Sequence, residues 1–231
     1  MKPAKNTNNK PQNKEIEPLT KKEFKLLLHN SNDMYKLIYI IGATMGLRES
    51  EILWIDIKDI NHTNQTLTYR VQKTKNDLVT EKKIPHQVYD LILKYIKQNK
   101  LNLEDPLFKI INGAYAGNRI SSKTVSKRTK EKFIKLNIGK TRAIRSVKSK
   151  HNPIKSAKLH SKNFHSLRHL YGTEVFDITE SMEITANTLR HARGNLETVR
   201  KHYVKLHNLE REANIQNAIT EKLLFEPTSA T

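Results

Sequence analysis

The chain has 231 residues, enough for one generous domain or two small ones with a real hydrophobic core. Lysine and arginine number 42 against 23 acidic residues, and the net charge of +19 favours a polyanion such as nucleic acid as the partner. Without any cysteine the chain can form no disulfide, cysteine-ligated zinc site or iron–sulfur cluster, and it has no apolar run long enough to cross a bilayer.

The first elements are expected to be a polar arm and three helices. Residues 1–18 are rich in Asn, Lys and Pro, which is typical of a flexible arm. A helix is predicted to begin after Thr20, where the spacing fits a capping box. The largely apolar run 34–45 predicts a second helix that Gly46 can end, and residues 52–55 predict a short third helix.

After these helices the spacing of apolar residues changes from a helical period to the alternation that is typical of strands. Apolar and polar residues alternate over 67–71, residues 73–77 are typical of a turn, and a second short run ends at Ile84. This pattern predicts a small antiparallel sheet.

Helical spacing returns in the second half of the chain. Helices are expected over 88–96, 125–136, 164–175, 195–203 and 209–223. Residues 140–162 have few apolar anchors and much Lys, Ser and Arg, so a long basic loop is expected there. The predicted fold class is therefore α+β, mainly α with a small antiparallel β-sheet.

One segment carries most of the charge. Residues 119–168 hold 16 Lys and Arg against a single acid, which is +15 of the total of +19. A solvated surface is the ordinary explanation of a charge run, but so local an excess favours contact with phosphates. The candidate DNA-binding residues are Arg119, Lys123, Lys127, Arg128, Lys130, Arg142 and Arg145.

Two common catalytic motifs are missing from the sequence. Residues 42–46 (GATMG) lead into Leu47 and Arg48, where a phosphate-binding loop would have Lys and Ser or Thr. No Gly-x-Ser-x-Gly elbow is found either, so a serine hydrolase lacks its strongest signal.

The remaining candidates are cationic and imidazole side chains. His165, Arg168 and His169 have i, i+3 and i+4 spacing, which puts them on one helical face. The two histidines could bind a metal, but no nearby acid offers a third ligand, so a phosphate is favoured. Further along the chain, His191 and Tyr203 lie among basic residues. A phenolic oxygen that attacks a phosphodiester, with guanidinium groups neutralising the transition state, suits this set.

Taken in order, these residues resemble those of the tyrosine recombinase (phage integrase) family. The segment GATMGLRESEIL is similar to its first arginine box, HSLRHLYGTE to its His-x-x-Arg box, and LRHARGNLETVRKHYV to its closing segment. The resemblance assigns the catalytic roles to Arg48, Lys75, His165, Arg168, His191 and Tyr203.

The resemblance implies how a scissile phosphate would be held. Arg48 and Arg168 would clamp the non-bridging oxygens, while His165 and His191 would assist by hydrogen bonding and proton transfer. Glu51 would be the carboxylate that positions Arg48.

The resemblance also implies the chemical steps. Tyr203 would attack to form a 3′-phosphotyrosyl link, and a lysine of the predicted turn, Lys75 in preference to Lys73, would protonate the leaving 5′ oxygen. Neither metal nor any other cofactor is expected. The spacing between His191 and Tyr203 is longer than the family commonly shows, by nearly one helical turn, which a helix could absorb.

The expected organisation follows from the same resemblance. Residues 19–205 would form the catalytic domain, and residues 206–231 a helix or tail that packs back as core or, as the family implies, contacts other subunits. The implied partners are double-stranded DNA and further copies of the chain, in a tetramer on DNA. Only residues 1–18 precede the expected catalytic domain, so the usual core-binding domain is expected to be missing. A cytoplasmic, nucleoid-associated protein is expected.

Two other functions remain open at this point. The chain could be a decayed integrase that binds DNA without turnover. It could also resemble a type IB topoisomerase, which relaxes supercoils by similar chemistry without exchanging partners.

Overall fold

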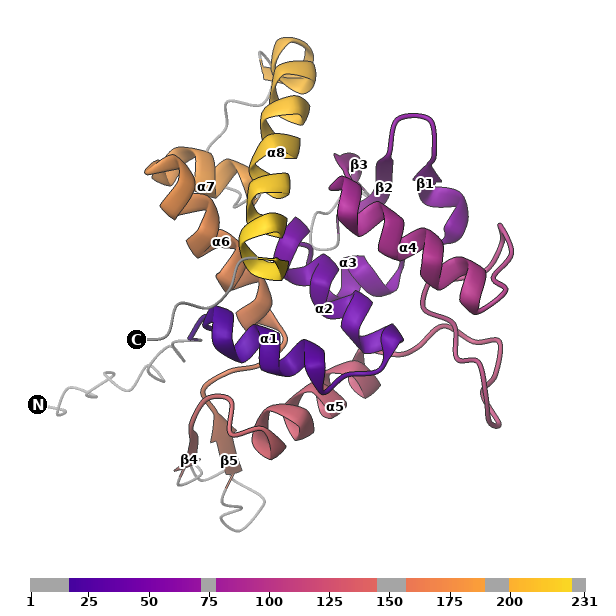
Figure 1. Ribbon diagram of the computed structural model, residues 1–231, viewed down its shortest axis with the longest axis vertical. Coiled ribbons are helices and arrows are strands. Elements are labelled where there is room, and N and C mark those ends of the chain that lie inside the picture. Colours follow the sequence, from indigo (N-terminus) through magenta and orange to yellow (C-terminus); the bar gives the residue numbers. More distant parts are fainter. Residues whose placement is uncertain (1–16, 72–77, 145–156, 190–199, 226–231) are drawn as a thin grey trace, which may run out of the picture.

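The computed structural model describes residues 17–71, 78–144, 157–189 and 200–225, and in the last range it describes side chains from residue 212 onward (Figure 1). Helices predominate in these ranges, with one three-stranded sheet and one two-stranded sheet. The expected fold class, mainly α with a small antiparallel sheet, is confirmed.

The chain begins with helices α1 (Lys21–His29), α2 (Asp33–Met45) and α3 (Glu49–Leu53). The capping box at the start of α1 is present, because the Glu23 amide donates to the Thr20 hydroxyl and the Thr20 amide donates to the Glu23 carboxylate. Helix α2 ends at Gly46, whose φ of 63° lies in the left-handed region. A Cβ at Gly46 would also collide with the ring of Tyr171, so the turn needs glycine for two reasons.

A short 3-10 helix, η1 (Ile57–Asp59), leads into the sheet β1 (Ile60–Asn61), β2 (Thr66–Val71) and β3 (Leu78–Lys83). The strand order is β1-β2-β3, and both pairings are antiparallel. In the β2–β3 ladder Leu67 is paired with Lys82 and Tyr69 with Thr80. The predicted turn at 73–77 lies outside the described residues.

The second half of the chain is again helical apart from one pair of strands. Its elements are α4 (His86–Gln98), α5 (Ser122–Lys135), β4 (Thr141–Ile144), β5 (Ala157–His160), α6 (His165–Thr179), α7 (Met182–Thr188) and α8 (Arg200–Leu224). None of the helices in the described ranges has the length and apolar character that a membrane span requires.

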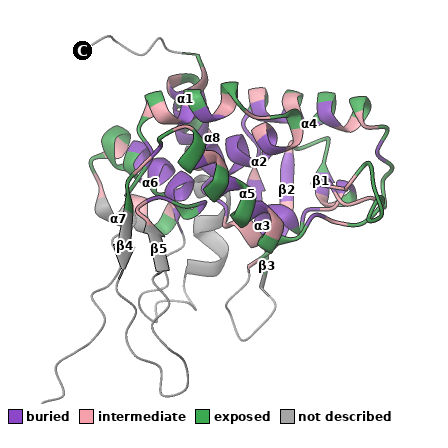
Figure 2. Ribbon diagram, turned by 90° about the horizontal axis from the view of Figure 1, so that it is seen from below, coloured by how far each residue is buried: buried purple, intermediate pink, exposed green. Residues whose placement is uncertain are grey.

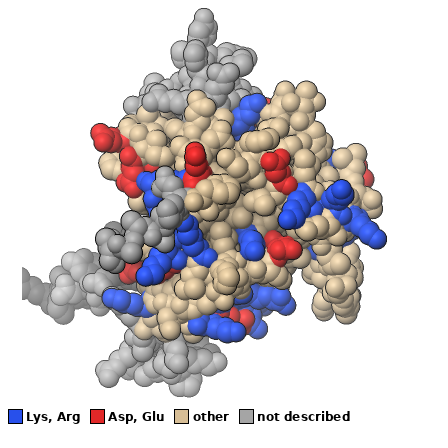
Figure 3. All heavy atoms as spheres, in the orientation of Figure 1, with Lys and Arg blue, Asp and Glu red and all other residues tan. Residues whose placement is uncertain are grey.

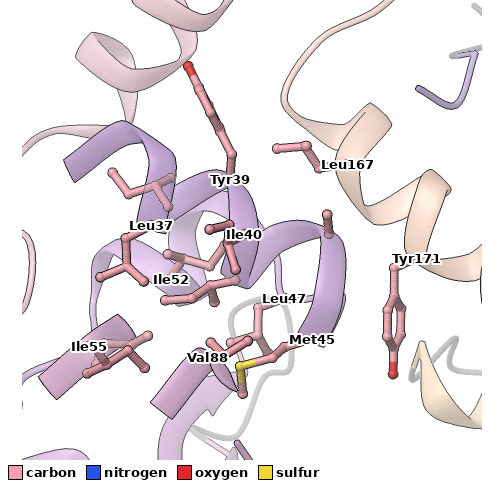
Figure 4. Packing of buried hydrophobic residues seen from close by; sticks show 14 of the residues in the cluster. Leu37, Tyr39, Ile40, Met45, Leu47, Ile52, Ile55, Val88, Leu167 and Tyr171 are labelled. Atoms are coloured by element: carbon pink, nitrogen blue, oxygen red, sulfur yellow. The ribbon is translucent and has the colours of Figure 1, made fainter. Parts of the chain in front are cut away.

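Helix α2 lies at the centre of the core and is buried along nearly its whole length (Figure 2). It contacts α1, α3, α4, α6 and α8. Side chains of α3, α4 and α6 pack against those of α2, and Figure 4 shows Ile40 of α2 together with Ile52, Val88 and Leu167. Each fully buried aliphatic side chain contributes about 1.5–3 kcal/mol, so this central helix fixes the positions of the surrounding elements.

Two expectations about the second half were wrong, and one helix has no counterpart among the predicted elements. The predicted loop 140–162 contains β4 and β5, which pair antiparallel with Arg142 opposite Leu159. Two separate helices were expected around Tyr203 and Leu209, whereas α8 is continuous from Arg200 to Leu224. Helix α7 was not expected at all. The start of the helix expected over 195–203 lies outside the described residues.

Candidate active site

The first arginine lies in the turn that connects α2 to α3. Arg48 is the N-cap residue of α3, directly after the Gly46 turn. Its Nη1 donates to Glu51 Oε1 at 2.8 Å, and its backbone amide donates to Glu51 Oε2 at 2.8 Å. Because the Glu51 side chain is buried while that of Arg48 is partly exposed, an inner carboxylate holds an outward-facing guanidinium. The contact expected between these two residues is present.

The second arginine, on α6, is more deeply buried than the sequence suggested. Arg168 is 6% exposed, and its guanidinium donates to the backbone carbonyl oxygens of Gly46 and Leu189. Burial, followed by the charge of Arg48, lowers the pKa of Arg168 to about 10. The guanidinium therefore remains charged at neutral pH. Its bond to Gly46 ties the His-x-x-Arg segment to the turn that carries Arg48.

The two histidines of α6 lie beside this arginine, on the surface. His165 and His169 are both exposed, and their ring centroids are 4.9 Å apart with the planes nearly perpendicular. Although His169 is exposed, part of its ring is removed from water, and this partial burial, followed by the charge of Arg168, lowers the pKa of His169. A neutral imidazole at pH 7 can accept a proton. Among the described residues, no group of three or more His, Asp or Glu side chains could hold a metal ion.

The structure brings only part of the predicted site together. Arg48, Glu51 and Arg168 lie at the junction of α2, α3 and α6, and His165 lies on α6 three residues before Arg168. Three predicted residues, Lys75, its alternative Lys73, and His191, lie outside the described residues. Tyr203 belongs to helix α8, but its side chain also lies outside the described set.

Tyr171 and Lys82 are two further buried polar residues. The helical spacing of residues 164–175 predicts Tyr171 on the inner face of its helix, whereas Lys82 was not among the predicted site residues. The Tyr171 ring fills the space beside Gly46, and the ammonium of Lys82 lies 5.4 Å from the centroid of that ring. Complete burial raises the pKa of Tyr171 well above its ordinary value. The alternation of β3 was the available signal, because Lys82 is paired with the buried Leu67 and cross-strand partners share a face.

A basic helix begins next to the arginines. Ser122 and Ser126 of α5 donate their hydroxyl groups to the Glu49 carboxylate at 2.5 and 2.8 Å. Since Glu49 follows Arg48 in the chain, these bonds connect α5 to the candidate site. The exposed cations on this helix are Lys123, Lys127, Arg128, Lys130 and Lys135. In the view of Figure 3, Lys and Arg side chains gather at the lower edge of the molecule, where α5 lies.

The other candidate DNA-binding residues have different surroundings. Arg119 forms an ion pair with Asp56, donates to the Leu53 carbonyl oxygen at 2.7 Å and lies 5.0 Å from the centroid of the exposed Trp54 ring. Its guanidinium thus has partners within the chain, which favours a structural role over a phosphate contact. Arg142 is on β4 with its side chain outside the described set, and Arg145 lies outside the described residues.

Solved structures of integrases and recombinases have the same fold as this chain. The integrase from mycobacterium phage Brujita matches over 92% of this chain and 60% of its own, at 15% identity and a TM-score of 0.60. The Tn1549 transposon integrase in complex with transposon right end DNA matches over 91% and 62%, at 15% identity and a TM-score of 0.55. XerA recombinase matches over 81% and 64%, at 18% identity and a TM-score of 0.54.

These matches assign the fold to the chain. The chain spans less than two thirds of the length of each of these three proteins. No protein-family model and no curated protein sequence matches it. The fold and the arginine pair together are the basis for a function.

Proposed function

We propose that this chain, which has the fold of the tyrosine recombinases, is a site-specific DNA recombinase or integrase that cuts and rejoins DNA through a 3′-phosphotyrosyl intermediate. One observation carries the proposal: two arginines that are far apart in sequence, Arg48 and Arg168, meet at the Gly46 turn. Two neighbouring guanidinium groups repel each other, and such a pair suits a site built for an anion.

The arginine site would stabilise the transition state of phosphoryl transfer. Arg48, held by Glu51, would bind the non-bridging oxygens of the scissile phosphate. Arg168 would add a second positive charge on the inner side, in a setting that is largely shielded from water. The negative charge that develops on these oxygens during attack is the charge that the two side chains would neutralise.

The reaction would then proceed in two balanced steps. The Tyr203 oxygen would form a bond to phosphorus as the bond to the 5′ oxygen breaks, with the phenolic proton passing to His165 or His191. Lys75 would supply a proton to the leaving 5′ oxygen. Attack by a 5′ hydroxyl from another strand would reverse the step and release Tyr203. No cofactor is needed, because the energy of the broken bond is kept in the phosphotyrosyl link.

The DNA would lie across the arginine site and the basic helix α5. Exposed lysines on this helix extend the positive surface beyond Arg48. They would contact phosphates, and such contacts need no base-specific group. The proposed partner is double-stranded DNA, and the recombination reaction would assemble several copies of the chain, expected as a tetramer, on it. Residues 19–205 would supply the catalytic side chains.

A nicked suicide substrate tests the proposal. The protein is incubated with the substrate, and a covalent protein–DNA adduct is sought on a denaturing gel. We expect an adduct from the native chain and from Tyr115→Phe, which alters a tyrosine that is 72% exposed, and none from Tyr203→Phe.

The same substrate separates the other two functions. DNA binding without any adduct would point to an integrase fold that has lost turnover. An adduct accompanied by relaxation of supercoiled DNA, with no strand exchange between two duplexes, would point to topoisomerase-like activity. Either result would contradict the recombinase proposal.

A further inference from the structure

Helix α8 packs onto the core of its own chain. Ile215, Ile219 and Leu223 of α8 are buried, and the helix contacts α1, α2, α4, α6 and β3 of the same chain (Figure 1). The resemblance implied a terminal segment that contacts other subunits, whereas the described part of this segment completes the fold of its own chain. The helix that carries Tyr203 is thus anchored at its C-terminal half.

A buried lysine lies at the centre of this anchor. Lys82 of β3 is 1% exposed, and its ammonium forms an ion pair with Glu212 of α8. The Gln216 amide, oriented to satisfy both of its ends, accepts from Lys82 Nζ at 3.2 Å and donates to the Lys83 carbonyl oxygen at 2.9 Å. Strand β3 therefore holds one face of α8, since Glu212 and Gln216 are one helical turn apart.

These contacts define one position of α8, because a buried ammonium is stable only where its partners are correctly placed. Removing an ammonium from water is costly unless its partners are well placed. Here an opposite charge, an amide oxygen and the face of the Tyr171 ring surround it. A shift of α8 along β3 would leave the charge without these partners, so the contact fixes the helix in one position.

A second ion pair fixes the far end of the helix. Lys222 Nζ lies 2.7 Å from Glu174 Oε2, and Glu174 is a buried residue of α6. Because α6 also carries Arg168, the helix with the candidate nucleophile is joined directly to the element with a candidate activating arginine. Both anchors lie within one chain.

We infer that Lys82 is a positioning residue: together with Glu212 and Gln216 it fixes α8 so that Tyr203 attacks the phosphate held by the arginines of its own chain. This inference rests on the proposed recombinase function. Residue 203 lies about 14 Å along the helix from Glu212, at 1.5 Å per residue. A tilt of roughly 10° at the anchor would move it by about 2 Å, and a misplacement of 1 Å already costs about 100-fold in rate.

Paired substitutions test the positioning role. Lys82→Met leaves the partly buried carboxylate of Glu212 without its partner. We expect the rate of adduct formation to fall at least about 10-fold while DNA affinity changes less than about twofold. The double variant Lys82→Met/Glu212→Met replaces the ion pair by apolar groups, and most of the lost rate should return. Lys58→Met, which breaks the exposed pair with Glu104, is the matched control and should leave the rate unchanged.

Hydrogen exchange separates positioning from other roles. The α8 amides should exchange faster in Lys82→Met and return towards the native rate in the double variant. A double variant with slow exchange but no recovery of rate would mean that the ammonium takes part in the chemistry, which overturns the inference. If Lys82→Met lowers the rate of adduct formation, the DNA affinity and the unfolding midpoint together, Lys82 only stabilises the fold. That result would also overturn the inference.

A mixing experiment tests delivery within one chain. Tyr203→Phe keeps the arginine site, and Arg168→Ala keeps the tyrosine, so together they form an adduct only if one chain supplies its tyrosine to another. We expect no adduct above the sum of the two separate reactions. An adduct in the mixture would overturn delivery within the chain. If the native chain forms no adduct at all, the proposed function is wrong, and the role assigned to Tyr203 is wrong with it. In that case the hydrogen-exchange measurement still tests whether Lys82 anchors α8.

Discussion

At the scale of single residues, the candidate site depends on carboxylates and carbonyls that orient two arginines. The Arg48–Glu51 contact could be predicted, because a carboxylate three residues ahead on a short helix reaches back to the N-cap. The burial of Arg168 could not, since its acceptors are the backbone carbonyls of Gly46 and Leu189, which are distant in sequence. Helical spacing places side chains on a face but does not say which neighbour covers that face.

Replacing the inner carboxylate tests how Arg48 is held. In Glu51→Gln the guanidinium loses its charged partner, so we expect cleavage to slow by about 10- to 100-fold, a cost of about 1.5–3 kcal/mol for a charged hydrogen bond. DNA affinity should stay within about twofold, because the role proposed for Arg48 is to stabilise the transition state. Single-turnover adduct formation and a binding titration measure the two effects. Glu104→Gln, at an exposed carboxylate, is the control; an equal fall in both variants would contradict the role of Glu51.

The lowered pKa of His169 predicts a pH dependence of stability. Partial burial of the ring and the charge of Arg168 disfavour protonated His169 in the folded state. The unfolded chain therefore binds more protons as the pH falls below 6.5, the ordinary pKa of histidine. The contribution of His169 to the free energy of unfolding is therefore present above that pH and is lost as the pH falls towards the lower folded pKa. Denaturant titrations between pH 7 and 5 should show a shallower fall for His169→Asn than for the native chain. Parallel curves would show that His169 does not titrate differently in the two states.

At the scale of elements, the helices with strong caps or clear apolar spacing were the predictable ones. The cap at Thr20, the stop at Gly46 and the cap at Ser121 are all used. The β4–β5 pair was not predictable, because both strands are short, carry charged residues and are far apart in the chain. The sequence does carry a signal for the continuity of α8, because no Gly or Pro interrupts it between residues 195 and 226.

The turn between α2 and α3 should be intolerant of a side chain. Gly46→Ala adds a Cβ that meets the Tyr171 ring, in a backbone conformation that L-residues disfavour. Gly113→Ala is the matched control, since its φ of 95° is also positive but no atom lies within 4 Å of the added carbon. We expect Gly113→Ala to cost about 1–2 kcal/mol and Gly46→Ala at least about 3 kcal/mol. Chemical denaturation gives both values, and equal costs would mean that Tyr171 does not restrict the turn.

At the scale of the whole molecule, the charge is concentrated on one set of elements. The excess of positive charge within 119–168 could be counted in the sequence. Only the fold shows that α5 is hydrogen-bonded to Glu49, the residue after Arg48. Arg119 illustrates the difference, because its charge belongs to the same segment and yet is paired with Asp56. Figure 2 places α4 on the side of the molecule opposite α3 and β3, which makes its lysines a natural comparison.

Salt titrations distinguish the two surfaces. If Lys127 and Lys130 each contact a phosphate, the double variant Lys127→Gln/Lys130→Gln should bind DNA more weakly, and the slope of log affinity against log salt should decrease by about 1.8. Lys94→Gln/Lys97→Gln on α4 removes the same charge from exposed positions and should change the slope by less than about 0.5. The same change of slope in both double variants would mean that net charge, and not the α5 surface, governs binding.

The central claim is that one phenolic oxygen becomes bonded to DNA phosphorus at a site activated by Arg48 and Arg168. Peptide mapping of the covalent adduct by mass spectrometry tests it most directly. We predict a nucleotide attached to the peptide that contains Tyr203, in the native chain but not in Arg168→Ala. Attachment to another residue, or an undiminished yield without Arg168, would contradict the account.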